Sequence, residues 1–164
     1  MPEKTGDLSG VQLLLPFSDL IIIRDGDQDA RRLYDRHYSA RHYRDGRRPK
    51  KIMGPGEYLL LTTPDRKCLV GFRVSNRPIG VQEGIYLSIF RNESDRIASK
   101  VLRLACQLAF SRWPAQSTIF TFVNPKKVKK NGCPGYCFLR AGFRRIGRTQ
   151  RGLIVMRLQR HQLR

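Results

Sequence analysis

His37 and Tyr38 are adjacent residues whose side chains can move protons. An imidazole has an unperturbed pKa of ~6.5, so His37 is suited to accept a proton from an amine at neutral pH. The alternative for His37 is a hydrogen-bonded, partly buried histidine on a helix face. Tyr136 carries a phenol that can act as a general acid, or that can instead pack or stack on a base. His37, Tyr38 and Tyr136 are the candidate catalytic residues.

The four cysteines do not have the spacing of a zinc site. The closest pair is Cys133 and Cys137, a C-x3-C spacing, and the chain has only three histidines and no matching second half-site. We therefore expect no bound metal. Cys137 is interpreted as a small buried residue rather than a nucleophile.

Two basic segments are predicted to be loops that contact a polyanion. Cations in loops can follow phosphates without a regular surface, and Tyr38, Tyr43 and Tyr136 flank the two segments, where they could stack on a flipped or unpaired base. The alternative is a pair of solvated charge runs. The predicted phosphate contacts are Arg41, Arg44, Arg47, Arg48, Lys50, Lys51, Lys126, Lys127, Lys129 and Lys130.

The composition favours a folded protein with an anionic partner. Lys and Arg total 32 against 13 acidic residues, for a net charge of +19, and 40% of the residues are hydrophobic. DNA is the expected partner, with a membrane surface as the second possibility. No stretch reaches the ~18 apolar residues of a membrane span and no signal peptide is visible, so a cytoplasmic location is expected.

The first half of the chain must position His37 and Tyr38. A β-branched run at 19–24 predicts a buried strand, Asp27 offers a helix N-cap, and apolar residues at steps of three or four predict a helix from Gln28 to about Tyr43. Pro and Gly make 44–56 a loop. The next strands are expected at 57–63, 68–74 and 84–90.

The second half must position Tyr136. Ser94 is expected to cap a helix that runs to Trp113, followed by a strand at 118–123, a short helix within 135–143 and a strand at 152–158. The expected order is β-α-β-β-β-α-β-α-β, an α/β fold with a mixed sheet flanked by helices. At 164 residues a single domain, 1–164, is expected, with its core at about 19–158 between a polar N-terminal and a basic C-terminal tail.

The segment Gly135 to Phe143 resembles a motif of the GNAT superfamily of acyl-CoA N-acyltransferases. Those enzymes carry a helix of roughly A-x-x-L-Y-x-K-x-G-F after the fifth strand, which leads into the last hairpin, and Phe138, Arg140, Gly142 and Phe143 match it. Gly142 suits a left-handed C-cap, and Phe143 can fold back onto the core. The resemblance implies a GNAT-like fold. The family's usual acid maps onto Phe138, so Tyr136 is the nearest substitute.

The resemblance also implies acetyl-CoA as co-substrate. The family's Q/R-x-x-G-x-G/A turn corresponds to 93–98 here, where only Ala98 fits and both glycines are missing. Backbone N–H groups of the fourth strand would polarise the thioester carbonyl. The equally weighted alternative for 93–98 is an ordinary capped core helix. The implied co-substrate residues are Ser88, Ile89, Phe90, Arg91, Ser94, Arg96, Ala98 and Phe138.

A narrower resemblance is to bacteriophage DNA-modification proteins of the GNAT-like group, both Mom-type proteins and phage acetyltransferases of hypermodified thymine. The Mom group places a His-Tyr pair in its proposed active site, which His37-Tyr38 matches. This resemblance implies acetyl transfer from acetyl-CoA to the amine of 5-aminomethyl-deoxyuridine in DNA, which would protect a viral genome from host restriction. The alternatives are Mom-like adenine modification, a non-catalytic nucleic-acid-binding protein on a GNAT scaffold, and acetylation of a protein or a ribosomal RNA-associated amine.

Overall fold

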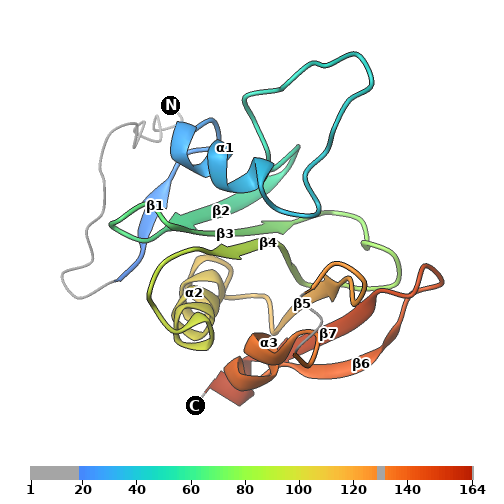
Figure 1. Ribbon diagram of the computed structural model, residues 1–164. Helices are drawn as coiled ribbons and strands as arrows, with labels where there is room; N and C mark the ends of the chain where they lie inside the picture. The colour runs from blue at the N-terminus through green and yellow to red at the C-terminus, as the bar shows by residue number, and fades with distance from the viewer. Residues whose placement is uncertain (1–18, 129–131, 164) are drawn as a thin grey trace, which may run out of the picture.

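The computed structural model describes residues 19–128 and 132–163, and it contains one seven-stranded sheet (Figure 1). The strand order is β1-β2-β3-β4-β5-β7-β6. The strands are β1 (Ile21–Ile23), β2 (Glu57–Thr62), β3 (Cys68–Val74), β4 (Ile85–Asn92), β5 (Thr118–Val123), β6 (Arg144–Arg148) and β7 (Ile154–Gln159). The helices are α1 (Gln28–Asp35), α2 (Ala98–Arg112), α3 (Tyr136–Ala141) and the 3-10 helix η1 (Arg160–Leu163). The predicted mixed α/β class is confirmed.

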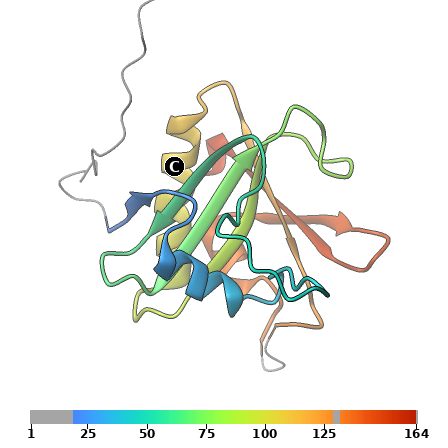
Figure 2. The ribbon, with the colours of Figure 1, turned by 90° about the horizontal axis from the view of Figure 1, so that it is seen from above.

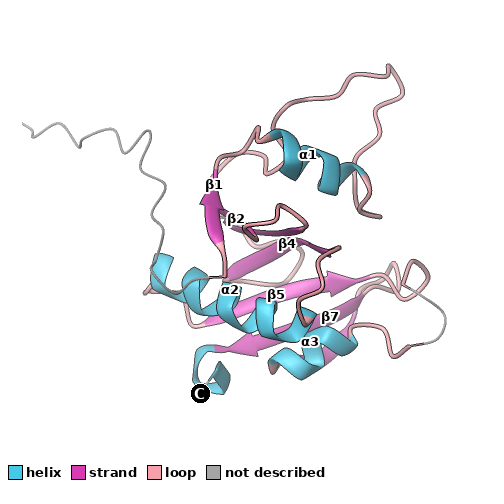
Figure 3. Cartoon of the chain, turned by 60° about the vertical axis from the view of Figure 1, so that its left-hand side comes forward, coloured by secondary structure: helices cyan, strands magenta, loops and turns pink. Residues whose placement is uncertain are grey.

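The sheet consists of two antiparallel halves joined by one parallel pair. Strands β1 to β4 pair antiparallel in chain order, β5, β7 and β6 form the second antiparallel half, and β4 runs parallel to β5. Helix α1 packs on one face of the first half, whereas α2 and α3 cover the opposite face (Figure 3). The larger core lies under α2, where alternate strand residues such as Leu61, Phe72 and Leu87 are buried.

Helix α1 ends eight residues before the predicted end. Asp27 caps it as expected, because its carboxylate accepts the backbone N–H groups of Asp29 and Ala30. The helix stops at Asp35, and the N–H of His37 bonds the Tyr34 carbonyl in a closing turn. The prediction of a helix to Tyr43 was therefore wrong, and the His37-Tyr38 pair lies in the turn after α1.

The loop from 41 to 56 is fixed at its far end. The carboxylate of Asp25 accepts hydrogen bonds from the backbone N–H groups of Ile52 and Met53, at 2.7 and 2.9 Å. The Tyr34 hydroxyl accepts the N–H of Arg41 at the loop's beginning. In the view from above, this loop arches over the face of the sheet beside α1 (Figure 2). Both ends of the basic loop are thus anchored next to α1.

Helix α3 ends as its sequence predicts. Gly142 has φ of 106°, the left-handed region, and its N–H bonds back to the last turn, while the N–H of Phe143 bonds the Phe138 carbonyl. Phe143 is buried in the α2 core. The C-cap interpretation of this motif is confirmed.

Three expectations for the second half need correction. β6 is an additional strand, so the order ends α3-β6-β7 rather than α3-β. Ser94 does not cap α2, since the helix begins at Ala98 after Ile97 and the Ser94 hydroxyl bonds Asn92 instead. The C-terminal residues are not a free tail: the Arg160 guanidinium donates to carbonyls at the end of α2 and just beyond it, including those of Phe110 and Trp113.

The described part of the chain contains neither a membrane-spanning helix nor a cluster of metal ligands. None of its helices is long and apolar enough to cross a membrane. Within 19–128 and 132–163, no group of three or more His, Cys, Asp or Glu side chains is arranged to hold a metal ion.

Candidate active site

The two halves of the sheet separate along β4 and β5. Among the described residues the two strands pair only at Ile85–Ile119 and Tyr86–Phe120, although β4 continues to Asn92 and β5 to Val123. Just past the paired region, the Thr121 hydroxyl donates to the Leu87 carbonyl across the gap. From Ser88 onward, one backbone edge of β4 therefore faces an opening instead of a neighbouring strand.

A β-bulge lies at the start of this opening. Gly71 pairs with Ile89 and Phe72 with Leu87, so Ser88 is an extra residue without a partner on β3. The Ser88 hydroxyl donates to the Gly71 carbonyl. A Cβ on Gly71 would lie 2.9 Å from the Met53 sulfur, so a side chain there would displace the Met53 thioether that packs against the bulge. The bulge thus turns the backbone of Ser88 and Ile89 at the point where the strands part.

The turn after α1 places Tyr38 beside this opening. Burial raises the pKa of Tyr38, a hydrogen bond with the Asn124 backbone opposes that effect, and the nearby Cys137 adds to it. Asn124 follows β5 and Cys137 lies in α3, so the Tyr38 hydroxyl lies among residues of β5 and α3. The Tyr38 phenol is protonated at neutral pH, as that of a tyrosine with the ordinary pKa of about 10 already is.

His37 stacks on Tyr38, with ring centroids 4.4 Å apart. Its Nδ1 accepts the backbone N–H of Ser39 and lies 2.7 Å from the Ser39 hydroxyl. Burial and, to a smaller extent, the Arg91 charge lower the pKa of His37 to about 4, although a hydrogen bond with the Phe90 backbone opposes them. The imidazole is therefore neutral at pH 7, as a base must be, but it is a weak base that already ties the turn to β4.

The residues of α3 differ in exposure. Phe138 packs in an aromatic cluster, edge to face with Phe90 at 5.9 Å and with Phe143 at 5.4 Å. Cys137 is half-buried, and burial raises the pKa of its thiol. Tyr136 is 60% exposed at the first position of the helix. Tyr38 thus lies beside Asn124 and near Cys137, whereas Tyr136, the chain neighbour of Cys137, is largely exposed and Phe138 belongs to the core.

The turn between β4 and α2 contains an ion-pair network. Glu93 accepts hydrogen bonds from Arg36 at 2.7 and 2.9 Å and from Arg91 at 2.5 Å. These bonds lower the pKa of Glu93 to about 2, against a smaller effect of burial. Arg91 also donates to the Arg36 carbonyl. Glu93 and Arg91 therefore clamp the turn that carries His37 and Tyr38 onto the end of β4.

The start of α2 is where the phosphates of coenzyme A would bind if the resemblance holds for this segment. Ile97 precedes the helix without any side-chain cap, so the first backbone N–H groups, from Ala98 on, remain as donors for an anion. Arg36, which the sequence did not place here, adds a cation near this turn, where it pairs with Glu93. The Arg96 guanidinium lies 3.5 Å from the Asp65 carboxylate and 3.8 Å from that of Asp19, so its charge is partly neutralised. Of the predicted contacts, Ala98 begins the helix, the Arg91 guanidinium bonds Glu93, and the Ser94 hydroxyl bonds Asn92, so the backbone amides are the donors that the helix start leaves for an anion.

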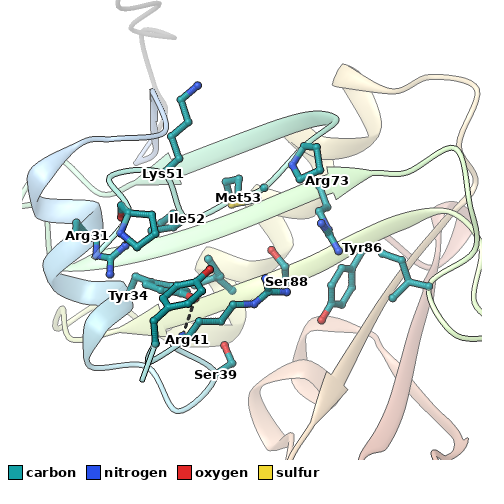
Figure 4. Close-up of a pocket in the computed structure, with 16 residues that line it drawn as sticks. Arg31, Tyr34, Ser39, Arg41, Lys51, Ile52, Met53, Arg73, Tyr86 and Ser88 are labelled. Atoms are coloured by element: carbon teal, nitrogen blue, oxygen red, sulfur yellow. Dashed lines mark hydrogen bonds between the residues drawn. The ribbon is translucent and has the colours of Figure 1, made fainter. Parts of the chain in front are cut away.

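A cavity of about 360 Å³ opens on the α1 side of β4 (Figure 4). Four cationic side chains line it, and in the part of the chain that the structure describes no Asp or Glu does so. Tyrosines and the bulge complete the wall. The lining includes Arg31, Arg41, Lys51, Arg73, Tyr34, Tyr43, Tyr86, Ser88 and Ile89. Because Ser88 and Ile89 line it, the cavity lies next to the part of β4 that no longer pairs with β5.

Arg73 and Tyr86 are cavity residues that the sequence analysis missed. The Arg73 guanidinium lies 5.6 Å from the centre of the Tyr86 ring, and its buried Nε has no hydrogen-bond partner within residues 19–128 and 132–163. The Arg31 charge is partly neutralised, because its Nε lies 3.0 Å from the Asp35 carboxylate. The only available signal was the alternation of the strands, which gives no reason to choose these two positions.

The predicted phosphate contacts fall in several places. Arg41 and Lys51 line the cavity, while Arg44, Arg47, Arg48 and Lys50 are exposed in the loop beside it. Arg47 covers the Tyr43 ring at 4.3 Å, and Arg48 pairs with Asp35. Lys126 and Lys127 are exposed after β5, whereas Lys129 and Lys130 lie outside the described residues.

Comparison with known proteins gives only distant likenesses. No known family profile and no curated protein sequence matches the chain. Among solved structures, aminoglycoside acetyltransferase AAC(6')-Ib in complex with coenzyme A is 20% identical with a TM-score of 0.46. The match covers 64% of this chain and 66% of that one, just under two thirds of its length. The same protein with ribostamycin and coenzyme A gives 20% identity and a TM-score of 0.47, with 64% of each chain covered. Likenesses of this size leave the activity to be inferred from the site itself.

Proposed function

We propose that this protein is a GNAT-like N-acyltransferase that moves an acetyl group from acetyl-CoA to an amine on an anionic substrate. The observation that carries the proposal is the cavity lined by cations and free of described carboxylates, which opens at the β4 bulge where β4 and β5 part. An acceptor bound there lies next to the backbone edge of Ser88 and Ile89. Bound acetyl-CoA would supply an acyl thioester.

The backbone and the tyrosine divide the remaining work. N–H groups of the β4 edge polarise the acyl carbonyl, because fixed dipoles stabilise the negative charge that develops on its oxygen. The uncapped start of α2, with Arg91 and Ser94, holds the phosphates. Tyr38, whose phenol is protonated at neutral pH, supplies a proton to the departing thiolate, and solvent then returns a proton to the phenolate.

The cations of the cavity also prepare the amine. A positive charge near an ammonium group disfavours its protonated form, so Arg41, Lys51 and Arg73 lower the pKa of an amine bound between them. A strong protein base is then unnecessary, which agrees with the low basicity of His37. In this proposal His37 positions Tyr38, and water receives the proton of the amine.

The charge of the cavity selects the class of acceptor. Aminoglycosides are polycations, and four cationic side chains would repel them, whereas a phosphate-bearing acceptor gains from the same field. Nucleic acid is the anionic acceptor that also uses the exposed loop cations near Tyr43. Within this class we propose the amine of 5-aminomethyl-deoxyuridine in viral DNA, with an adenine amine as the alternative acceptor.

The test is acetyl transfer to defined DNA. The protein is incubated with acetyl-CoA and oligonucleotides that contain 5-aminomethyl-deoxyuridine, and the digested nucleosides are weighed by mass spectrometry. We expect a gain of one acetyl group on the aminomethyl nucleoside, none on matched thymidine DNA, and little transfer to kanamycin. Transfer to kanamycin alone would overturn the anionic acceptor, and transfer to adenine would move the activity to the Mom-like alternative.

A non-catalytic nucleic-acid-binding protein is the second candidate function. Two observations favour it. Phe138 lies at the position of the general acid in the resembled family, and the Glu93 carboxylate binds Arg36 and Arg91, two arginines that could otherwise bind phosphate near the start of α2. Calorimetry separates the two candidates, because the enzyme requires acetyl-CoA binding in the micromolar range. Binding of DNA without any binding of acetyl-CoA would establish the second candidate.

A further inference from the structure

The second half of the chain carries its charge very unevenly. No Asp or Glu follows Asp95, so the last 69 residues contain 16 Lys and Arg and no acidic residue. These residues form α2, β5, α3, β6 and β7. A surface built from them attracts a polyanion without internal competition from carboxylates.

The edge hairpin β6–β7 presents part of this charge. All five residues of β6 are exposed, and Arg151 in the connecting turn is exposed as well. Arg144 is opposite Arg157 of β7, so the two side chains lie on the same face of the sheet. Arg145 lies on the other face, where it donates to the Pro134 carbonyl.

That face of β5 and β7 is the one that α2 and α3 leave uncovered. Ile119, Met156 and Leu158 pack under the helices, so the alternate residues, which include Phe122 and Arg157, point the other way. Tyr86 of β4 lies against Phe120 at 5.2 Å and Phe122 at 5.6 Å. Phe120 is buried, but Tyr86 and Phe122 are only half-buried.

Tyr86, Phe122, Arg144 and Arg157 together are called the basic–aromatic face. At its β4 end it meets the cavity, because Tyr86 lines both and Arg73 lies over the Tyr86 ring. At its other end it approaches the exposed Arg151 in the hairpin turn, whereas Arg148 is opposite Ile154 and so lies on the helix side of the sheet. Arginines interleaved with accessible aromatic rings match the recognition of unpaired bases, whose flat faces stack while their phosphates are neutralised.

We propose that a single-stranded nucleic acid segment binds along the basic–aromatic face. Its phosphates follow Arg144, Arg157 and Arg151, and one unpaired base stacks at Tyr86 and Phe122 on the way to the cavity. A duplex keeps its bases stacked on one another, so it can use the arginines but not the rings. The proposal rests on the proposed function, since it describes how the acceptor strand reaches that cavity.

The test measures binding by fluorescence anisotropy without any acyl donor. Labelled oligonucleotides of one sequence, single-stranded and duplex, are titrated at several salt concentrations. We expect tighter binding of the single strand. Each neutralised phosphate contributes about 0.7 to the salt slope of a single strand, so Arg144→Gln with Arg151→Gln should lower the slope by about 1.4. Phe122→Leu, which keeps an apolar side chain, should weaken single-strand binding about tenfold.

The matched control removes the same charge from the helix side. Lys100→Gln with Arg112→Gln, both exposed at opposite ends of α2, should leave the salt slope nearly unchanged. Equal or tighter duplex binding, or an equal loss in the control, overturns the proposal. Thermal melting of each variant confirms folding. Binding without acetyl transfer would reject the proposed function alone, and acetyl transfer with a normal slope in the Arg144 and Arg151 variant would reject this inference alone.

Discussion

At the scale of single residues, the site depends on what the turn after α1 does with two side chains. The sequence suggested His37 as a base, but its ring is held by Ser39 and the Phe90 backbone and its pKa is lowered to about 4. Tyr38 beside it reaches Asn124 and keeps its proton. The pair is therefore interpreted as a donor and the residue that positions it.

Replacing Tyr38 by Phe tests the assignment of the acid. Tyr38→Phe removes only the hydroxyl, so we expect kcat to fall about 100-fold, the usual scale of general-acid catalysis, with little change in KM for acetyl-CoA. Tyr136→Phe is the matched control, since Tyr136 is 60% exposed and was the acid predicted from the sequence. Steady-state kinetics of both variants decides between them. A larger loss in Tyr136→Phe would assign the acid to α3.

At the scale of elements, the sequence predicted the helices and strands whose apolar residues recur at regular spacing. It failed for elements whose bounds depend on pairing or packing with distant parts of the chain. β3 and β5 have the predicted bounds because their residues are apolar in strand-like runs. β6 was missed because all of its residues are exposed and it pairs only with β7. α1 was extended too far because Tyr38 continues its apolar spacing, and local spacing does not show where backbone bonding stops.

The candidate site follows the same division. Residues joined by sequence, such as His37 and Tyr38 or the loop cations, could be nominated from their types. Arg73 and Tyr86 belong to adjacent strands and face the cavity only because of the sheet register, in which they are directly paired. Arg36 reaches Glu93 across 57 residues. Only the fold brings such groups together.

The turn between β4 and α2 gives a prediction at this scale. Glu93 holds Arg36 and Arg91, which phosphates of acetyl-CoA would otherwise attract. Glu93→Gln frees these cations, so calorimetry should show acetyl-CoA binding up to about fivefold tighter, the scale of an exposed ion pair. The same change loosens the clamp on the Tyr38 turn, so kcat should fall.

Asp95→Asn provides the control for this turn, because it removes one exposed negative charge without touching the clamp. We expect it to tighten binding less than Glu93→Gln does and to leave kcat unchanged. Weaker acetyl-CoA binding in Glu93→Gln would contradict the competition between Glu93 and the phosphates.

At the scale of the whole molecule, the half-buried His37 couples folding to pH. Its pKa is about 4 in the folded protein and 6.5 in an unfolded chain. Between these values the unfolded chain binds a proton that the folded protein excludes, so the free energy of unfolding falls as pH drops from about 6.5 to 4. A shift of this size corresponds to at most about 3 kcal/mol. Below pH 4 both states are protonated and this contribution has been lost.

Urea unfolding of the wild type and of His37→Asn at pH 7 and pH 4.5 measures this contribution. Carboxylates such as Glu93 also affect acid stability, but the folded pKa of Glu93, about 2, lies below this window and its contribution is common to both proteins. The difference between the two proteins therefore isolates His37. We expect the wild type to lose about 2 kcal/mol more than the variant between the two pH values, somewhat less than the full linkage because pH 4.5 is above the folded pKa. Equal losses would mean that the imidazole is accessible to solvent, and would return His37 to consideration as a base.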